Sequence, residues 1–319
     1  MSRYSEKPLD FLKLKTIPIA DRGGKVRVDA FASPHKKGDD LIAFLVGLPH
    51  ILAGDTLRAV VESLIRAREA KRQIIWGLGG HVIKCGLAPV LIDLMKRGFA
   101  TAFAMNGAAA IHDFEIAISG ATSEDVEAVL PDGRFGSADE TGHEMSHALD
   151  YGVRNDLGAG EAYGLRLVQL TRPDFRRHSL LYSAYENTTP VTVHIAVGTD
   201  TPHAHPLANG ANLGAASHRD FKLFCSLVQG LEGGGVYINL GSAVILPEVF
   251  LKAVSVVRNL GGTLSDFTTV NIDFQQHYRP KMNVVERPHA GGMGEGYSLT
   301  GHHEILLPLI AAALVECSE

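Results

Sequence analysis

Cysteine is scarce in this sequence, and it has neither long apolar runs nor an excess of positive charge. The three cysteines, Cys85, Cys225 and Cys317, lie far apart and form no C-x-x-C spacing, which excludes a disulfide-stapled scaffold and favours reduced thiols. The longest apolar stretch, residues 305–315, is far shorter than the roughly 20 residues that span a bilayer. Lys and Arg number 30 against 35 Asp and Glu, so no cationic surplus attracts nucleic acid or an anionic membrane. Because the N-terminal residues also lack an apolar signal segment, we expect a cytoplasmic protein with no nucleic-acid or membrane partner.

The remaining composition is that of an ordinary folded protein. Hydrophobic residues make up 45% and charged residues 20% of the 319 residues, which excludes the disordered and fibrous classes. We interpret residues 1–54 as an N-terminal extension, because most of this segment is polar and interrupted by Pro and Gly. Residues 55–319 are expected to form one α/β domain.

Hydrophobic periodicity predicts alternating helices and strands. A helix is expected from Asp55 onward, where apolar residues recur with the spacing of one helical face. Strands are expected at 73–76, 99–105, 191–197, 236–240 and 266–273, and further helices at 87–95, 218–230, 247–260 and 303–316. This alternation indicates a three-layer α/β fold, a parallel sheet with helices on both faces. Residues 120–190 break the rhythm with acidic turns and tyrosine-containing loops, and we interpret them as an insertion or lid.

Small residues follow four of the predicted strands, at 77–81, 106–113, 198–205 and 241–242. In a parallel sheet the carboxyl ends of the strands meet at one edge, where backbone N–H groups and helix N-termini bind ligands. None of the four segments spells G-x-G-x-x-G or a P-loop. Nucleotide binding is therefore only weakly indicated by the pattern, and glycines that simply allow tight turns are an equal alternative.

Histidine and acidic residues gather at the same predicted strand ends. The groups are His81, His112 with Asp113 and Glu115, Asp200 with His203 and His205, and the run His302-His303-Glu304. A single histidine at a helix start is more often a solvated cap than a ligand, but groups from separate elements can share one crevice. We therefore expect these side chains to lie near one another.

The segment from His143 to His147 matches the pattern H-E-x-x-H. On a helix this spacing places both imidazoles on one face, and Glu144 could act as the base for a zinc-bound water. No third ligand is evident, although Glu161 is available. The motif lies in sequence rich in Gly and acidic residues, so a chance match is the competing interpretation.

Over about residues 56–119 and 190–315 the order of elements resembles the deoxyhypusine synthase family. The segments that carry the resemblance are IIWGLGGHVIKCGLAPVLIDLM, ATAFAMNGAAAIHDFEIA, TPVTVHIAVGTD, VYINLGSAVILPEVF, FTTVNIDFQQHYRP and HHEILLPLIAAAL. The resemblance implies a Rossmann-like, nicotinamide-binding fold and a homotetramer built as a dimer of dimers. It also implies an NAD site made by Gly80, His81, Asn106, Gly107, Asp200, Gly241, Ser242, Asn271 and His302.

The sequence departs from that family where its chemistry is carried out. The family forms an imine on a lysine within Trp-Gly-Lys, whereas the only tryptophan here is Trp76 and Lys281 is the only amine in the corresponding stretch. The acidic residues that would hold a polyamine are replaced by Ile111-His112 and by residues 201–205, which include two histidines. Imidazoles favour a metal, an anion or proton transfer, so we expect chemistry other than deoxyhypusine formation.

The leading hypothesis is an NAD-dependent transferase or oxidoreductase acting on an amine or another small-molecule substrate. Its expected proton-transfer groups are His112, His205 and His302, oriented by Asp113 or Asp200, with Lys281 as the nominated amine carrier.

Two alternatives remain open. The first is a hydrolase or lyase that uses a divalent metal such as zinc, bound by His143 and His147 or by a cluster of His203 with His112, Asp113 and His205. The second is a nucleotide-binding protein without catalytic activity.

Overall fold

The computed structural model describes residues 2–170 and 175–318, and its centre is a six-stranded parallel sheet. The strands are β1 (Ile74–Leu78), β2 (Ala102–Asn106), β3 (Val191–His194), β4 (Gly235–Leu240), β5 (Phe267–Asp273) and β6 (Glu295–Thr300). The helices are α1 (Leu41–Gly47), α2 (Leu52–Glu69), α3 (Gly80–Lys84), α4 (Ala88–Lys96), α5 (Gly107–Ser119), α6 (Val126–Val129), α7 (Asp139–Arg154), α8 (Ala159–Gln169), α9 (Leu180–Glu186), α10 (Gly210–Gln229), α11 (Ile245–Asn259), α12 (Tyr278–Pro280) and α13 (His303–Cys317).

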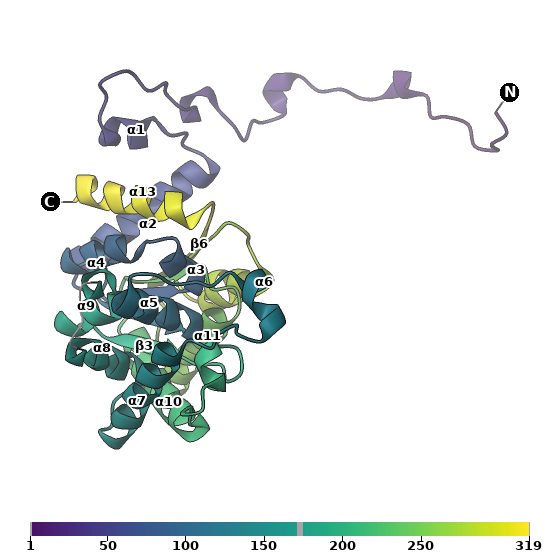
Figure 1. Cartoon of the computed structure of the whole chain (residues 1–319). Helices are drawn as coiled ribbons and strands as arrows, with labels where there is room; N and C mark the ends of the chain where they lie inside the picture. The colour runs from purple at the N-terminus through teal and green to yellow at the C-terminus, as the bar shows by residue number, and fades with distance from the viewer. Residues whose placement is uncertain (1, 171–174, 319) are drawn as a thin grey trace.

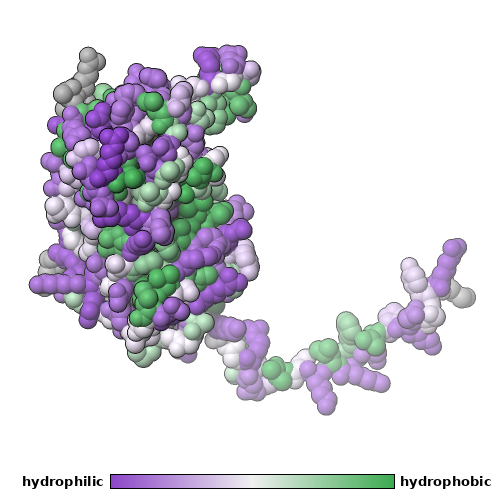
Figure 2. All heavy atoms as spheres, turned by 90° about the horizontal axis from the view of Figure 1, so that it is seen from below, coloured by the Kyte–Doolittle hydropathy of each residue, from purple (hydrophilic) through white to green (hydrophobic). Residues whose placement is uncertain are grey.

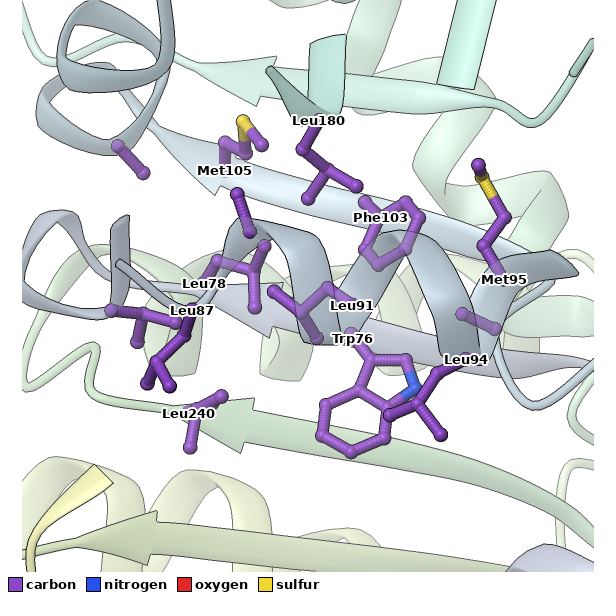
Figure 3. Close-up of a cluster of buried hydrophobic side chains, with 14 of the residues drawn as sticks. Trp76, Leu78, Leu87, Leu91, Leu94, Met95, Phe103, Met105, Leu180 and Leu240 are labelled. Carbon is purple, nitrogen blue, oxygen red and sulfur yellow. The ribbon is translucent and has the colours of Figure 1, made fainter. Parts of the chain in front are cut away.

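Both faces of the sheet are covered, which explains why its central strands are apolar without interruption. In β1, Trp76 and Leu78 enter the core beneath α2, α4, α5 and α13, whereas Ile75 enters the core beneath α10 and α11. The first of these cores, with Trp76 and Phe103 facing Leu91 on α4, is drawn in Figure 3. The predicted fold class, a Rossmann-like sheet between two helical layers, is confirmed.

The strand order is β3-β2-β1-β4-β5-β6. The chain builds one half of the sheet outward from β1 and the other half outward from β4, so the connections leave these two neighbours in opposite directions. Sheets of this order bind ligands in the crevice at the carboxyl ends of the strands where the direction reverses. The fold alone therefore directs attention to the segments that follow β1 and β4.

Two parts of the chain differ from the sequence-based expectations. The edge strand β6 was not predicted, because its residues are mostly exposed or half-buried and carry no apolar pattern. Residues 120–190, of which 171–174 lie outside the described residues, are largely helical and not loop-rich. Helices α7, α8 and α9 pack on one another, on α5, on α10 and on β3. Most of their residues are small or polar, so their narrow apolar faces are hard to recognise in the sequence. On α7 this face includes Met145, Ala148 and Leu149.

The N-terminal residues project from the body as an extended arm (Figure 1). We define the arm as residues 2–40, ahead of α1, which packs against α13. Short helical turns interrupt it, and its apolar side chains have no cover: Leu12 is 95% exposed and Val28 81% exposed. Among the described residues, no helix is both long enough and apolar enough to cross a membrane.

The buried indole of Trp76 is expected to contribute strongly to stability. Its Nε1 donates a hydrogen bond to the Phe99 carbonyl at 2.8 Å, and the side chain is fully buried. Trp76→Ala should lower the free energy of unfolding by about 3–5 kcal/mol, through lost burial and the cavity left behind. Urea unfolding followed by circular dichroism measures this. Leu260→Ala, at a side chain that is 80% exposed, is the matched control and should change stability by less than about 0.5 kcal/mol.

Candidate functional site

The segments that leave β1 and β4 touch at the point where the strand order reverses. Gly79 N donates to the Leu240 carbonyl at 2.9 Å, and a Cβ on Gly79 would lie 2.0 Å from the Gly241 carbonyl oxygen. Gly241 has a φ of +69°, and a Cβ there would lie 2.8 Å from the His303 ring. Glycine is therefore required at both positions by contacts within the chain itself.

A second close approach joins the carboxyl ends of β2 and β3. A Cβ on Gly107 would lie 1.8 Å from Asp200 Oδ2, so this glycine makes room for the carboxylate. The Asp200 side chain is only 8% exposed, and burial raises its pKa although His203 Nε2 lies 3.8 Å away and opposes the shift. His205 Nε2 lies 3.3 Å from Asp139 Oδ1 at the start of α7, and its ring packs against Gly142. Asp200 and His203 thus lie beside Gly107, whereas His205 packs against α7.

His112 is held by a relay of side chains. The Thr122 hydroxyl donates to Glu115 Oε2 at 2.5 Å and lies 2.7 Å from His112 Nδ1. The single hydroxyl hydrogen of Thr122 lies in the hydrogen bond to the Glu115 carboxylate. His112 Nδ1–H must therefore donate to the Thr122 oxygen, and Nε2 carries no proton in the neutral ring. Burial, with a contribution from the Lys84 ammonium, lowers the pKa of His112 to about 4. The imidazole is therefore neutral at physiological pH, with an unprotonated Nε2.

A cavity of about 210 Å³ contains this group. Its lining residues include Lys84, His112, Glu115, Thr199, Asp200 and Thr201. A narrower pocket of about 20 Å³, room for about one water, adjoins it at Ile111 and Asp200 and includes Gly107 and His203. The arrangement can move a proton at His112 Nε2 near an amine and a buried carboxylate.

A larger hollow of about 850 Å³ opens on the other side of the relay, between α5, α7 and residues 121–138. It shares Glu115, Ser123 and Glu124 with the first cavity. Its walls also carry Glu140 and Glu144, and Arg134 is the one basic residue among the described lining. The hollow is therefore suited to a cationic molecule.

Asp113 follows His112 in the sequence, but its side chain points to the start of α9 and not into the His112 cavity. Its carboxylate is completely buried and accepts hydrogen bonds from the Ser179 hydroxyl at 2.5 Å, Leu180 N at 2.7 Å and Leu181 N at 2.8 Å. These are donors at the first turn of α9, so the side chain fixes that helix against α5. Burial outweighs the hydrogen bonds and raises its pKa to about 6.

The β5 side of the edge has its own polar group. Asn271 Oδ1 accepts from Asn239 Nδ2 at 2.8 Å, and the Asn239 amide also donates to the Ser242 carbonyl at 2.9 Å. Asn239 Oδ1 and His303 Nδ1 are buried and have no partner among the described residues. A polar ligand bound along this edge would satisfy such atoms.

Several predicted residues lie apart from the His112 cavity. His302 is exposed and stacks with Phe274, with ring centroids 6.1 Å apart. Lys281 pairs with Glu286 on the surface, at 3.8 Å. Asn106 is committed to its helix, since its side chain accepts from Ala109 N at 2.9 Å.

The H-E-x-x-H segment forms one turn of α7, and the rings of His143 and His147 lie 4.4 Å apart. Glu144, the expected base, is paired with Arg166. His203 lies with Asp200 and not with this pair. In the described part of the chain, the one group of three side chains placed to hold a metal is His81, Cys85 and Glu304.

Comparison with known proteins extends only to the fold. No family profile and no curated protein matches the sequence. Among solved structures, ArgZ, an arginine dihydrolase from the ornithine–ammonia cycle in cyanobacteria, aligns with a TM-score of 0.50 and 19% identity over 85% of this chain and 34% of that chain. AgrE in its complex with ornithine and NAD+ aligns with a TM-score of 0.50 and 15% identity, again over 85% and 34%.

A third structure, of an Entamoeba histolytica protein assigned as a deoxyhypusine synthase, has a TM-score of 0.50 and 11% identity over 90% of this chain and 97% of that chain. The chain therefore spans about a third of ArgZ and AgrE but nearly all of the third protein. The fold is similar to that of deoxyhypusine synthase, as the sequence resemblance implied, and one of these neighbours, AgrE, is seen in complex with ornithine and NAD+. Identities this low establish the fold alone.

Sequence reasoning missed Lys84, Thr122 and the Cys85–Glu304 contact. Lys84 lies one helical turn after Gly80, and this spacing could have indicated that Lys84 reaches the same edge of the sheet. Thr122 reaches His112 only because the chain after α5 folds back, for which the sequence offers no local sign.

Asp113→Ala should destabilise the fold. Each buried donor left without an acceptor costs about 1–3 kcal/mol, so the loss should be on the order of 3 kcal/mol or more. Asp113→Asn keeps one acceptor oxygen and should cost less. Because the folded-state pKa lies above the unfolded value, the contribution of this group falls as pH rises from about 4 to 6. Urea titrations of all three proteins across this range measure both effects, and a neutral alanine variant would contradict the capping role.

Proposed function

We propose that this chain is an NAD-dependent enzyme that oxidises or transfers a group on a small cationic amine, by chemistry changed from that of deoxyhypusine synthase. The observation that carries the proposal is the Glu115–Thr122–His112 relay, which keeps an unprotonated imidazole nitrogen beside Lys84 and Asp200 at the ligand-binding edge of the sheet. Groups with shifted pKa values that converge on a cavity are typical of catalytic sites.

The cofactor would lie across the crevice between β1 and β4. Gly80, Gly107, Gly241 and Ser242 would present backbone and small side chains to it, and Asn271 would face it from β5, as the family resemblance implies. The strand order and the NAD+ bound by AgrE support this placement. When bound, NAD+ supplies a hydride acceptor.

His112 Nε2 would take a proton from the substrate. As that proton arrives, Nδ1 stays hydrogen-bonded through Thr122 to Glu115, so the carboxylate stabilises the imidazolium that forms. The Glu115 carboxylate is itself held by a second hydroxyl, Thr141 Oγ1 at 3.2 Å. This arrangement orients the ring in the manner of other hydroxyl- and carboxylate-supported bases.

The amine would enter from the acidic hollow. Glu124 and Glu140 supply negative charge there, while Glu144 is already paired with Arg166. A carrier amine, if the reaction uses one, is better supplied by Lys84, which lines the cavity, than by the surface residue Lys281.

Metal-stripped protein titrated with NAD+ should melt at a higher temperature, because a ligand that binds only the folded state stabilises it. With NAD+ and a panel of diamines and polyamines, NADH absorbance should then rise. His112→Ala should lower the rate by roughly 100-fold or more, and Thr122→Val by roughly tenfold, with an altered pH profile. Thr56→Val, at a hydroxyl that bonds only its own helix, is the matched control.

Absence of any NAD+ effect on melting would overturn the proposal. NAD+ binding without turnover of any amine would instead support the non-catalytic, nucleotide-binding alternative. Full activity in His112→Ala would remove the relay from the reaction.

We also propose that the chain self-associates through its arm. The family resemblance implies a dimer of dimers. The arm carries exposed apolar side chains, among them Leu9, Phe11, Leu12 and Val28, and hydrophobic residues appear in green along the projecting segment in Figure 2. Apolar groups spread along an extended segment gain most when a second copy buries them.

Deletion of residues 2–40 should reduce the molar mass measured by light scattering to that of a smaller assembly. Leu9, Leu12 and Val28 replaced together by serine, in the full-length chain, should have the same effect without shortening it. An unchanged assembly in both variants would exclude the arm as an interface.

A further inference from the structure

Three potential metal ligands meet at the carboxyl end of β1. His81 and Cys85 stand four residues apart on α3 and its C-terminal cap, and Glu304 lies in the first turn of α13. Cys85 Sγ is 3.2 Å from His81 Nε2 and 3.8 Å from Glu304 Oε2. All three ligand atoms lie within 4.8 Å of one another.

These separations match the edges of a metal coordination polyhedron. A tetrahedral zinc ion, with about 2.3 Å to sulfur and about 2.0 Å to nitrogen or oxygen, sets its ligand atoms roughly 3.3–3.6 Å apart. The observed 3.2 and 3.8 Å bracket that range. The third pair, the His81 nitrogen and the Glu304 oxygen, lies within 4.8 Å, so an ion would draw these two exposed side chains together.

The surroundings hold the three ligands in place. The His81 ring meets the buried His303 ring edge-on, with centroids 5.7 Å apart, and the Phe274 ring at 6.3 Å. The second carboxylate oxygen of Glu304 lies 3.8 Å from His302 Nδ1, so a partner outside the ligand set can orient it. Cys85 and Glu304, which are 219 positions apart in the sequence, are thus brought together by α3 and α13.

We propose that His81, Cys85 and Glu304 form a binding site for a thiolate-tolerant divalent metal, of which Zn²⁺ is the best match. One imidazole, one thiolate and one carboxylate form a donor set that zinc accepts and that magnesium or calcium, which take oxygen ligands, do not favour. The two anionic donors offset the charge of the dication. His81 thereby has a role different from the cofactor contact that the family resemblance implied for it.

Three protein ligands leave a fourth position for water or a substrate atom. Sites of that kind are catalytic more often than structural, because structural zinc sites are closed by four protein ligands. Since Cys85 is only partly buried and the other two ligands are exposed, this position is open to solvent at the same edge of the sheet as the proposed cofactor crevice.

The test is a titration of the reduced, metal-free, full-length protein with Co²⁺ in the absence of NAD+. One equivalent per chain should produce tetrahedral cobalt absorption with a thiolate charge-transfer band, and Zn²⁺ should displace it. Cys85→Ser should abolish the band, and His81→Ala or Glu304→Gln should weaken binding by more than about tenfold. Cys225→Ser and His143→Ala are the matched controls and should change neither band nor affinity.

Circular dichroism and melting of each variant without metal establish that it is folded. Substoichiometric binding, a band that persists in Cys85→Ser, or one that disappears in Cys225→Ser or His143→Ala would overturn the proposal. Because NAD+ is absent from the measurement, failure here leaves the proposed enzymatic function standing, and failure of NAD+ binding leaves this site standing.

Discussion

The backbone contact between Gly79 and Gly241 is the constraint on which the rest of the edge depends. Parallel pairing of β1 with β4 continues one residue past the strands, through Gly79 N and the Leu240 carbonyl, and no side chain fits between the two segments. Helix α3 begins directly after this contact, at Gly80, and the His303 ring lies against Gly241.

Buried carboxylates hold the helical region between β2 and β3. Asp220 on α10 accepts from Gly160 N at 2.9 Å and Val193 N at 2.8 Å, and Asp113 does the same for α9. Burial raises the pKa of Asp220 to about 7 and that of Asp113 to about 6, since little solvent or cationic charge reaches them. The helices around the pocket beside His112 are thereby held by two buried carboxylates that accept hydrogen bonds from backbone N–H groups.

Much of the architecture could be predicted because the central strands and long helices follow simple periodicities. The predicted strand at 236–240 differs from β4 by one residue, and the predicted helix at 247–260 overlaps α11 almost completely. The β6 edge could not be predicted, since a strand of polar residues is defined by its partner β5 and not by its own pattern.

The candidate site was predictable only in part, for a related reason. Patterns name residues near a strand end, but which of them meet depends on loops and on pairs distant in sequence. His112 was predicted, whereas Thr122, which sets its tautomer, was not. Asp113 and Asp200 both follow a predicted strand in the sequence. Asp113 accepts hydrogen bonds from the first turn of α9, whereas Asp200 lines two pockets. Glu144, in the H-E-x-x-H motif, is paired with Arg166 from α8, a contact that the motif itself could not indicate.

The single tryptophan has a practical consequence. Trp76 is fully buried in the central strand, two residues before the end of β1, with Met105 and Phe103 on the neighbouring strand. Tryptophan fluorescence of this chain, excited at a wavelength where its eight tyrosines do not absorb, therefore arises from one indole shielded from solvent. Its emission wavelength reports on the integrity of the sheet itself, undiluted by signals from the arm or from the helical region.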